Sequence, residues 1–167
     1  MTKLALITGA TSGLGLSYAK YFAERRFDLI ITGRREEVIR RNAESLEKQY
    51  GVTVTVLIAE LSCKRGVDDL LDAVKGREID VLVNNAGFGL KPFFADTQEV
   101  DIDRLLYLQI NCVTRLTHYA LKGMLRRNCG SIINISPDGA FAVIPHNVLY
   151  SPSKLSILNL TEGCPLY

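Results

Sequence analysis

The chain has 167 residues, of which 47% are hydrophobic and 23% are charged, which suits a single globular domain. Its net charge is +2 with acidic and basic residues interleaved, so the composition argues against nucleic-acid binding and against attachment to a membrane surface. No segment approaches the roughly 20 apolar residues of a membrane span, and the apolar N-terminus lacks the basic region of a signal peptide.

Five short apolar runs predict buried strands, because they are rich in β-branched residues and apolar on both faces. They cover residues 4–8, 28–32, 54–58, 80–83 and 131–136. Longer amphipathic segments separate them, and this alternation predicts right-handed βαβ units. We therefore expect a doubly wound, Rossmann-like α/β fold: a parallel sheet between two layers of helices, forming one domain over residues 1–167.

The first strand leads into the glycine-rich stretch TGATSGLG (residues 8–15), which is followed by a helical pattern at Leu14, Tyr18, Tyr21 and Phe22. Glycines in such a turn let backbone N–H groups approach a pyrophosphate, whose charge the helix N-terminus favours. The stretch indicates a dinucleotide site; the alternative is a structural turn that binds no ligand.

The second strand is followed by Gly33, Arg34 and Arg35, with no acidic residue where an NAD-specific site would have one. A guanidinium group matches a phosphate bidentately. The alternative is a solvated basic turn, but cations at a helix start oppose the helix dipole. The pattern therefore favours NADP over NAD, with Arg34 on the 2′-phosphate.

The fourth strand ends in NNAG (residues 84–87), an unusual composition for a plain turn. Amides that brace the sheet, and a glycine that leaves room for a ligand ring, would explain it. The next segment has a long apolar stripe at helical spacing, which predicts a long helix. The stripe consists of Ile102, Leu106, Ile110, Val113, Leu116, Ala120 and Met124.

The fifth strand is followed by YSPSK (residues 150–154). Tyr150 and Lys154 are four residues apart and share one face of a helix. Pro152 is compatible with the first turn of that helix.

The whole chain resembles the short-chain dehydrogenase/reductase family. The resemblance is carried by the order and spacing of four features: TGATSGLG, NNAG, Asn111 of the long helix, and YSPSK. The resemblance implies that Tyr150 is the general acid/base, that Lys154 binds the nicotinamide ribose and that Asn111 holds a water in a proton relay. A phenol is a poor base at neutral pH, so the chemistry needs a nearby cation. The implied catalytic residues are Asn111, Ser136, Tyr150 and Lys154. The implied cofactor-binding residues are Gly9, Thr11, Ser12, Gly13, Leu14, Gly15, Arg34, Asn85, Ala86, Gly87, Tyr150 and Lys154.

Two features depart from the family. Its members usually have two serines at the end of the fifth strand, and the second, which polarises the substrate oxygen, aligns with Pro137. Loss of such a donor typically costs about a hundred- to a thousandfold in rate. Ser136 can replace it if the chain bulges after Ile135. The chain also stops at LTEGCPLY, before the family's last strands, so we expect a C-terminally shortened fold.

Two functions remain open. One is an NADP-dependent oxidoreductase that interconverts a carbonyl and a secondary alcohol; the other is an impaired or inactive family member that only binds dinucleotide. The resemblance also implies a small-molecule carbonyl or alcohol substrate and a homo-oligomer. Four widely spaced cysteines lack any metal-ligand pattern, which predicts reduced thiols, no metal site and a cytoplasmic protein.

Overall fold

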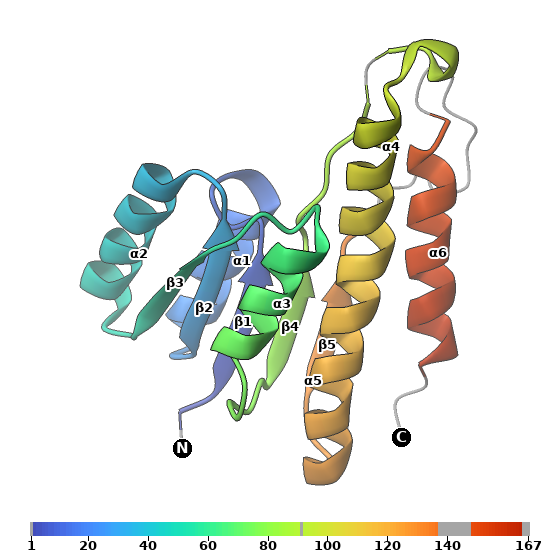
Figure 1. Ribbon diagram of the computed structural model, residues 1–167. Coiled ribbons are helices and arrows are strands. Elements are labelled where there is room, and N and C mark those ends of the chain that lie inside the picture. Colours follow the sequence, from blue (N-terminus) through green and yellow to red (C-terminus); the bar gives the residue numbers. More distant parts are fainter. Residues whose placement is uncertain (1, 91, 137–147, 165–167) are drawn as a thin grey trace.

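The computed structural model describes residues 2–90, 92–136 and 148–164 (Figure 1). Pro137, the residue aligned with the catalytic serine, lies outside the described residues, as does the rest of the segment 137–147. In the described part of the chain, no helix is both long and apolar enough to cross a membrane.

All five predicted strands form, and every pairing between them is parallel. The strands are β1 (Leu4–Thr8), β2 (Asp28–Gly33), β3 (Val54–Ile58), β4 (Val81–Asn84) and β5 (Ser131–Asn134). Their order in the sheet is β3-β2-β1-β4-β5. Strands β2 and β3 are added on one side of β1, and β4 and β5 on its other side, so the strand order reverses between β1 and β4. In open α/β sheets, ligands bind at the carboxyl ends of the strands where the order reverses. The predicted fold class is confirmed.

The strands alternate side chains between two cores, one on each face of the sheet. In β1, Ala5 and Ile7 face the core covered by α1 and α2, whereas Leu4 and Leu6 face the core covered by α3 and the long helix. The apolar composition of both faces therefore has a direct cause: helices cover the sheet on both sides.

The helices lie between the strands as the sequence pattern indicates. They are α1 (Gly13–Glu24), α2 (Glu36–Tyr50), α3 (Lys64–Ala73), η1 (Phe94–Asp96), α4 (Glu99–Leu106), η2 (Tyr107–Cys112), α5 (Val113–Arg127) and α6 (Tyr150–Gly163). The short η1 is a 3₁₀ turn, and η2 is a π-helical segment.

The predicted long helix is a continuous rod formed by α4, η2 and α5, and α6 packs beside it (Figure 1). The apolar stripe of the long helix is buried at Leu116, Ala120 and Met124 but only half-buried at Ile102 and Ile110. The π segment in the middle of the long helix was not expected. The spacing of apolar residues indicates which face of a helix is buried, but it does not show that one turn is wider than an α turn.

The apolar stripe of α1 differs from the expectation. Leu14 and Tyr21 are 60% and 48% exposed, whereas Ala19, Phe22 and Ala23 are buried. Small side chains let this helix approach the sheet closely, so the larger ones are displaced to its rim. Tyr21 instead has the Arg25 guanidinium group 3.5 Å from its ring centroid, a cation–π contact.

Candidate functional site

A cavity of about 440 Å³ opens at the carboxyl ends of β1, β2 and β4. It therefore lies at the point where the strand order reverses. The predicted cofactor residues that line it are Gly9, Thr11, Ser12, Arg34, Asn85, Ala86 and Gly87. Gly13, Leu14 and Gly15 belong to the same turn but do not line this cavity, and neither do the predicted cofactor residues Tyr150 and Lys154.

The glycines of the turn have two different structural roles. Gly9 and Gly13 have φ angles of +69° and +56°, a conformation that glycine adopts without steric cost. Gly15 lies so close to the end of β1 that an added Cβ would be 2.3 Å from the Gly9 carbonyl oxygen. An added Cβ at Gly13, by contrast, would meet no neighbouring atom of the described residues within 4 Å. The turn is thus packed against the sheet on one side and open on the other.

Hydrogen bonds join the glycine turn to the NNAG turn. The buried Thr8 hydroxyl accepts hydrogen bonds from the backbone N–H groups of Asn85 and Ala86, both at 3.0 Å. In return, Asn85 Nδ2 donates to the carbonyl oxygens of Thr8 and Gly9, at 2.9 and 3.1 Å. The asparagine that follows β4 therefore braces the sheet, as the sequence suggested, and both turns form one wall of the cavity.

The two arginines after β2 have different contacts. Arg35 Nη2 donates to the hydroxyl oxygens of Thr11 and Ser12, at 2.8 and 2.9 Å, so its guanidinium group lies on the glycine turn. Arg34 instead forms an ion pair with Glu60, at 3.2 Å. Both arginines line the cavity, but only Arg34 was assigned to the site from the sequence.

Glu60 is the centre of a polar cluster at the end of β3. It accepts hydrogen bonds from the Ser62 backbone and hydroxyl and from Arg34, and Arg104 of α4 lies 3.4 Å from its second oxygen. Partial burial alone would raise the pKa of Glu60, but the bonds from Ser62 and Arg34 outweigh it and hold the pKa below its usual 4.5. Glu60 therefore places a stable negative charge beside Arg34.

Lys154 reaches from α6 toward the NNAG turn. Its side chain is buried, and Nζ donates to the Ile135 carbonyl oxygen at 3.1 Å. A Cβ added at Gly87 would lie 3.5 Å from Nζ, and Nζ is 5.7 Å from the centroid of the Tyr150 ring. Burial lowers the pKa of Lys154 from its usual 10.5.

The other two implied catalytic residues have fewer contacts. Ser136 Oγ is 3.5 Å from the Lys154 carbonyl oxygen, which is the long limit of a hydrogen bond. Asn111 is exposed on the π segment, and its side chain forms no hydrogen bond to another residue of the described ranges. Lys154 thus lies near Ser136 through its backbone carbonyl and near the Tyr150 ring through its ammonium group, whereas Asn111 lies on η2 of the neighbouring helix.

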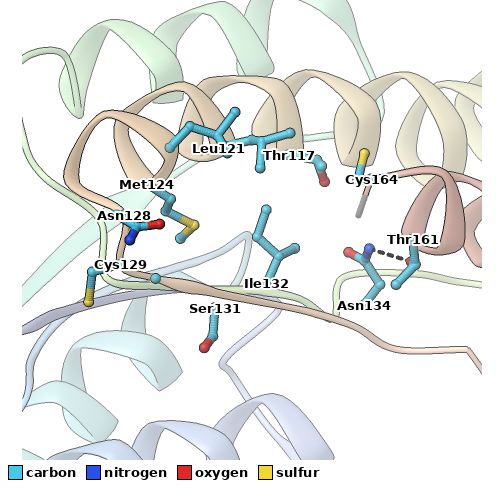
Figure 2. Close-up of a pocket in the computed structure, with 12 residues that line it drawn as sticks. Thr117, Leu121, Met124, Asn128, Cys129, Ser131, Ile132, Asn134, Thr161 and Cys164 are labelled. Atoms are coloured by element: carbon cyan, nitrogen blue, oxygen red, sulfur yellow. Dashed lines mark hydrogen bonds between the residues drawn. The ribbon is translucent and has the colours of Figure 1, made fainter. Parts of the chain in front are cut away.

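A second cavity, of about 220 Å³, lies between α5, β5 and the end of α6, and it contains none of the predicted site residues (Figure 2). A chain of amides and hydroxyls runs along it: Asn84 Nδ2 donates to Asn134 Oδ1, and Asn134 Nδ2 donates to Thr161 Oγ1, both at 2.8 Å. These bonds tie β4, β5 and α6 together, so we interpret this cavity as a feature of the packing.

Four residues near the site were not assigned to it from the sequence: Thr8, Arg35, Glu60 and Gln109. Thr8 and Arg35 are next to the assigned residues Gly9 and Arg34 in the sequence, and this adjacency could have indicated that they belong to the site. Glu60 follows β3 and comes beside Arg34 only through the pairing of β2 with β3. Gln109, a polar residue among the buried apolar positions of the long helix, was detectable from the stripe itself.

A family model described as short chain dehydrogenase matches residues 3–165. Among known proteins, a very-long-chain 3-oxoacyl-CoA reductase of Anas platyrhynchos is 35% identical over 164 residues, covering 95% of this chain and 53% of the reductase. This chain therefore spans about half the length of that relative.

Solved structures give the same picture. A short-chain dehydrogenase from Sphingobium yanoikuyae in complex with NADPH superposes with a TM-score of 0.92 at 30% identity, covering 96% of this chain and 63% of that one. A bulky-bulky ketone specific alcohol dehydrogenase from Comamonas testosteroni has a TM-score of 0.92 at 31% identity, covering 96% and 65%.

Proposed function

This chain belongs to the short-chain dehydrogenase family, and we propose that it binds NADP in the cavity at the carboxyl ends of β1, β2 and β4. The observation that carries the proposal is the placement of Arg35 on the hydroxyls of Thr11 and Ser12, beside the glycine turn. That arrangement gathers a guanidinium group, two hydroxyls and the N-terminus of α1 at one edge of the cavity. Each of these favours a phosphate group.

The choice of NADP over NAD follows from the charges at the end of β2. Arg34 and Arg35 both line the cavity, and Glu60, an acidic residue that lines it with them, already forms an ion pair with Arg34. A carboxylate engaged in this way is less available to a ribose hydroxyl, whereas the Arg35 guanidinium group offers donors to a 2′-phosphate. The NADPH bound by the Sphingobium yanoikuyae relative supports the same choice.

We further propose that the protein interconverts a carbonyl and a secondary alcohol. The nicotinamide would supply or accept the hydride. The Tyr150 hydroxyl would donate its proton to the carbonyl oxygen during reduction, and the Tyr150 phenolate would accept the proton of the alcohol during oxidation. Lys154, buried beside Tyr150 and Gly87, would orient the nicotinamide ribose. Homo-oligomerisation and a cytoplasmic location stay predictions from the family resemblance and the cysteine pattern.

A second candidate is a protein that binds dinucleotide without turnover. One observation favours it: proline follows Ser136, whose hydroxyl has only a long contact to the Lys154 carbonyl. With no second serine, a developing oxyanion would lack a preorganised donor.

Cofactor titration tests the first proposal. NADPH should bind at least about tenfold more tightly than NADH, the effect of one charge-assisted contact. Arg35→Ala should reduce that preference strongly and Arg34→Ala more weakly, since Arg34 is shared with Glu60. Arg40→Ala is the control, because Arg40 pairs with Glu36 on α2 and does not line the cavity. Equal affinities for NADPH and NADH in the unmutated protein would contradict the assignment.

An assay of carbonyl reduction distinguishes the two candidate functions. It compares the unmutated protein with the variants Tyr150→Phe and Pro137→Ser. Activity that Tyr150→Phe abolishes supports the oxidoreductase. If only Pro137→Ser reduces ketones, the unmutated chain is the dinucleotide-binding form. If Ser136→Ala alone abolishes an existing activity, Ser136 is the oxygen-polarising residue and the alignment of Pro137 with it is wrong.

A further inference from the structure

Gln109 is an amide in an apolar position. It lies in the π segment η2, among the buried residues Leu105, Leu108, Cys112 and Val113, and its own side chain is fully buried. Its Nε2 donates to the Phe88 carbonyl oxygen at 2.7 Å. Its Oε1 is also buried and has no hydrogen-bond partner among the described residues. A buried unpaired acceptor is unfavourable, so stability of the core alone does not explain a glutamine here.

The hydrogen bond of Gln109 connects the parts of the chain that carry the reactive end of the site. Phe88 follows Gly87 directly, and both line the cavity. Gly87 in turn has the Lys154 ammonium group beside it, 3.5 Å from where a Cβ would lie. The π segment that holds Gln109 also carries Asn111, and α6, which carries Lys154, packs against this segment.

The π geometry accounts for how one residue makes this connection. A π turn is wider than an α turn and interrupts its regular hydrogen bonding, and such turns are frequent at functional sites. Here it occurs where the long helix passes the NNAG turn, and the two are joined by Gln109 Nε2 and the Phe88 carbonyl. Arg34 and Arg35 follow β2 and hydrogen-bond to Glu60, Thr11 and Ser12, and none of these bonds within the described chain involves Gln109.

We propose that Gln109 is a positioning residue for the nicotinamide half of the dinucleotide site. By holding the Phe88 carbonyl, it fixes the NNAG turn at the distance from α6 that Lys154 requires. This inference rests on the proposed dinucleotide binding. It assigns the two halves of the cavity to different supports: Arg35 and the glycine turn for the adenine side, and Gln109 with the π segment for the nicotinamide side.

The test compares two probes that share the adenine half. NADPH contains both halves, whereas adenosine 2′,5′-bisphosphate lacks the nicotinamide. Gln109→Met keeps the length and removes the donor, and it should weaken NADPH binding about tenfold, the worth of one hydrogen bond. Binding of adenosine 2′,5′-bisphosphate should stay within about twofold of the unmutated protein. Gln98→Met, at an exposed glutamine just before α4, is the matched control and should change neither affinity.

Two outcomes overturn the proposal: unchanged affinity for both probes, or an equal loss for both, which indicates a general structural role. If the methionine variant does not fold, Gln109→Leu, which also lacks a donor, replaces it. Amide hydrogen exchange of residues 85–90 without ligand gives an independent measurement, and exchange should be faster in Gln109→Met. If the unmutated protein binds neither probe, the proposed function fails. In that case, faster exchange still supports the fixing of the turn by Gln109, and unchanged exchange refutes it.

Discussion

Thr8 and Thr32 provide a matched pair for measuring how the end of the sheet is held together. They are register partners at the carboxyl ends of β1 and β2, and they are 2% and 0% exposed. The Thr8 hydroxyl serves two backbone N–H groups of the NNAG turn, whereas the Thr32 hydroxyl has no hydrogen-bond partner in the described chain. Replacement by valine, which has nearly the same shape, removes only the hydroxyl in each case.

The two substitutions should act in opposite directions. Thr8→Val leaves two partly buried N–H groups unpaired, at about 1–3 kcal/mol each, so it should destabilise the protein by about 2–6 kcal/mol. Thr32→Val removes an unpaired buried hydroxyl, whose burial costs about 1–3 kcal/mol, so it should stabilise. At the lower limits the variants differ by about 3 kcal/mol, and at about 2–4 °C per kcal/mol their melting temperatures should differ by at least about 6 °C.

Thermal unfolding followed by circular dichroism at neutral pH measures this difference. An NADPH titration of both variants adds a second readout, because the NNAG turn that Thr8 holds lines the cavity. Thr8→Val should bind NADPH more weakly than Thr32→Val. Melting temperatures within about 2 °C of each other would refute the reasoning that the Thr8 hydroxyl is the shared acceptor.

Three further substitutions or reactions follow from the structure. Burial lowers the pKa of Lys154, so the unfolded chain binds more protons than the folded chain just below pH 10.5, and stability should rise with pH there. Urea unfolding at several pH values should show that Lys154→Met removes this rise, and a titration should show that it weakens NADPH binding. Burial raises the pKa of Cys112 to about 12 from 9.0, which leaves about a thousandfold less thiolate, so a thiol reagent should modify the exposed Cys63 and spare Cys112, as peptide mass mapping would reveal. Gly15→Ala places a Cβ 2.3 Å from a backbone oxygen and should destabilise by about 1–3 kcal/mol. Gly163→Ala, where a Cβ would meet no other side chain or strand of the described residues within 4 Å, should leave the melting temperature and NADPH affinity unchanged.

The strands were predictable because their signal is local. Runs such as residues 29–31 are apolar at every position, and a strand covered by helices on both faces needs that composition. The cavity wall was predictable for a related reason: Gly9 and Asn85 follow directly after strands, and parallel strands bring such ends together.

The contacts within the site were less accessible from the sequence. Arg34 and Arg35 are adjacent and chemically identical, so only the fold decides that one pairs with Glu60 and the other lies on the glycine turn. The partner of Gln109 is a backbone carbonyl, which has no signature in the residue types. The burial of Leu14 was predicted wrongly, since Leu14 is exposed. An apolar residue at helical spacing does not show how closely the helix approaches the sheet.

The bonds between Thr8 and the NNAG turn also bear on how the protein folds. They join residues 77 or 78 positions apart, and β4, which carries the NNAG turn, pairs with β1 on the side opposite to β2. Contacts of such long sequence separation form after local ones, since closing a long loop costs entropy before any bond is gained. A partly folded chain with its first three strands paired would have the glycine turn but no opposite wall. The ability to bind a dinucleotide should therefore emerge late in folding, when β4 pairs with β1, and ligand binding during refolding would report that single step.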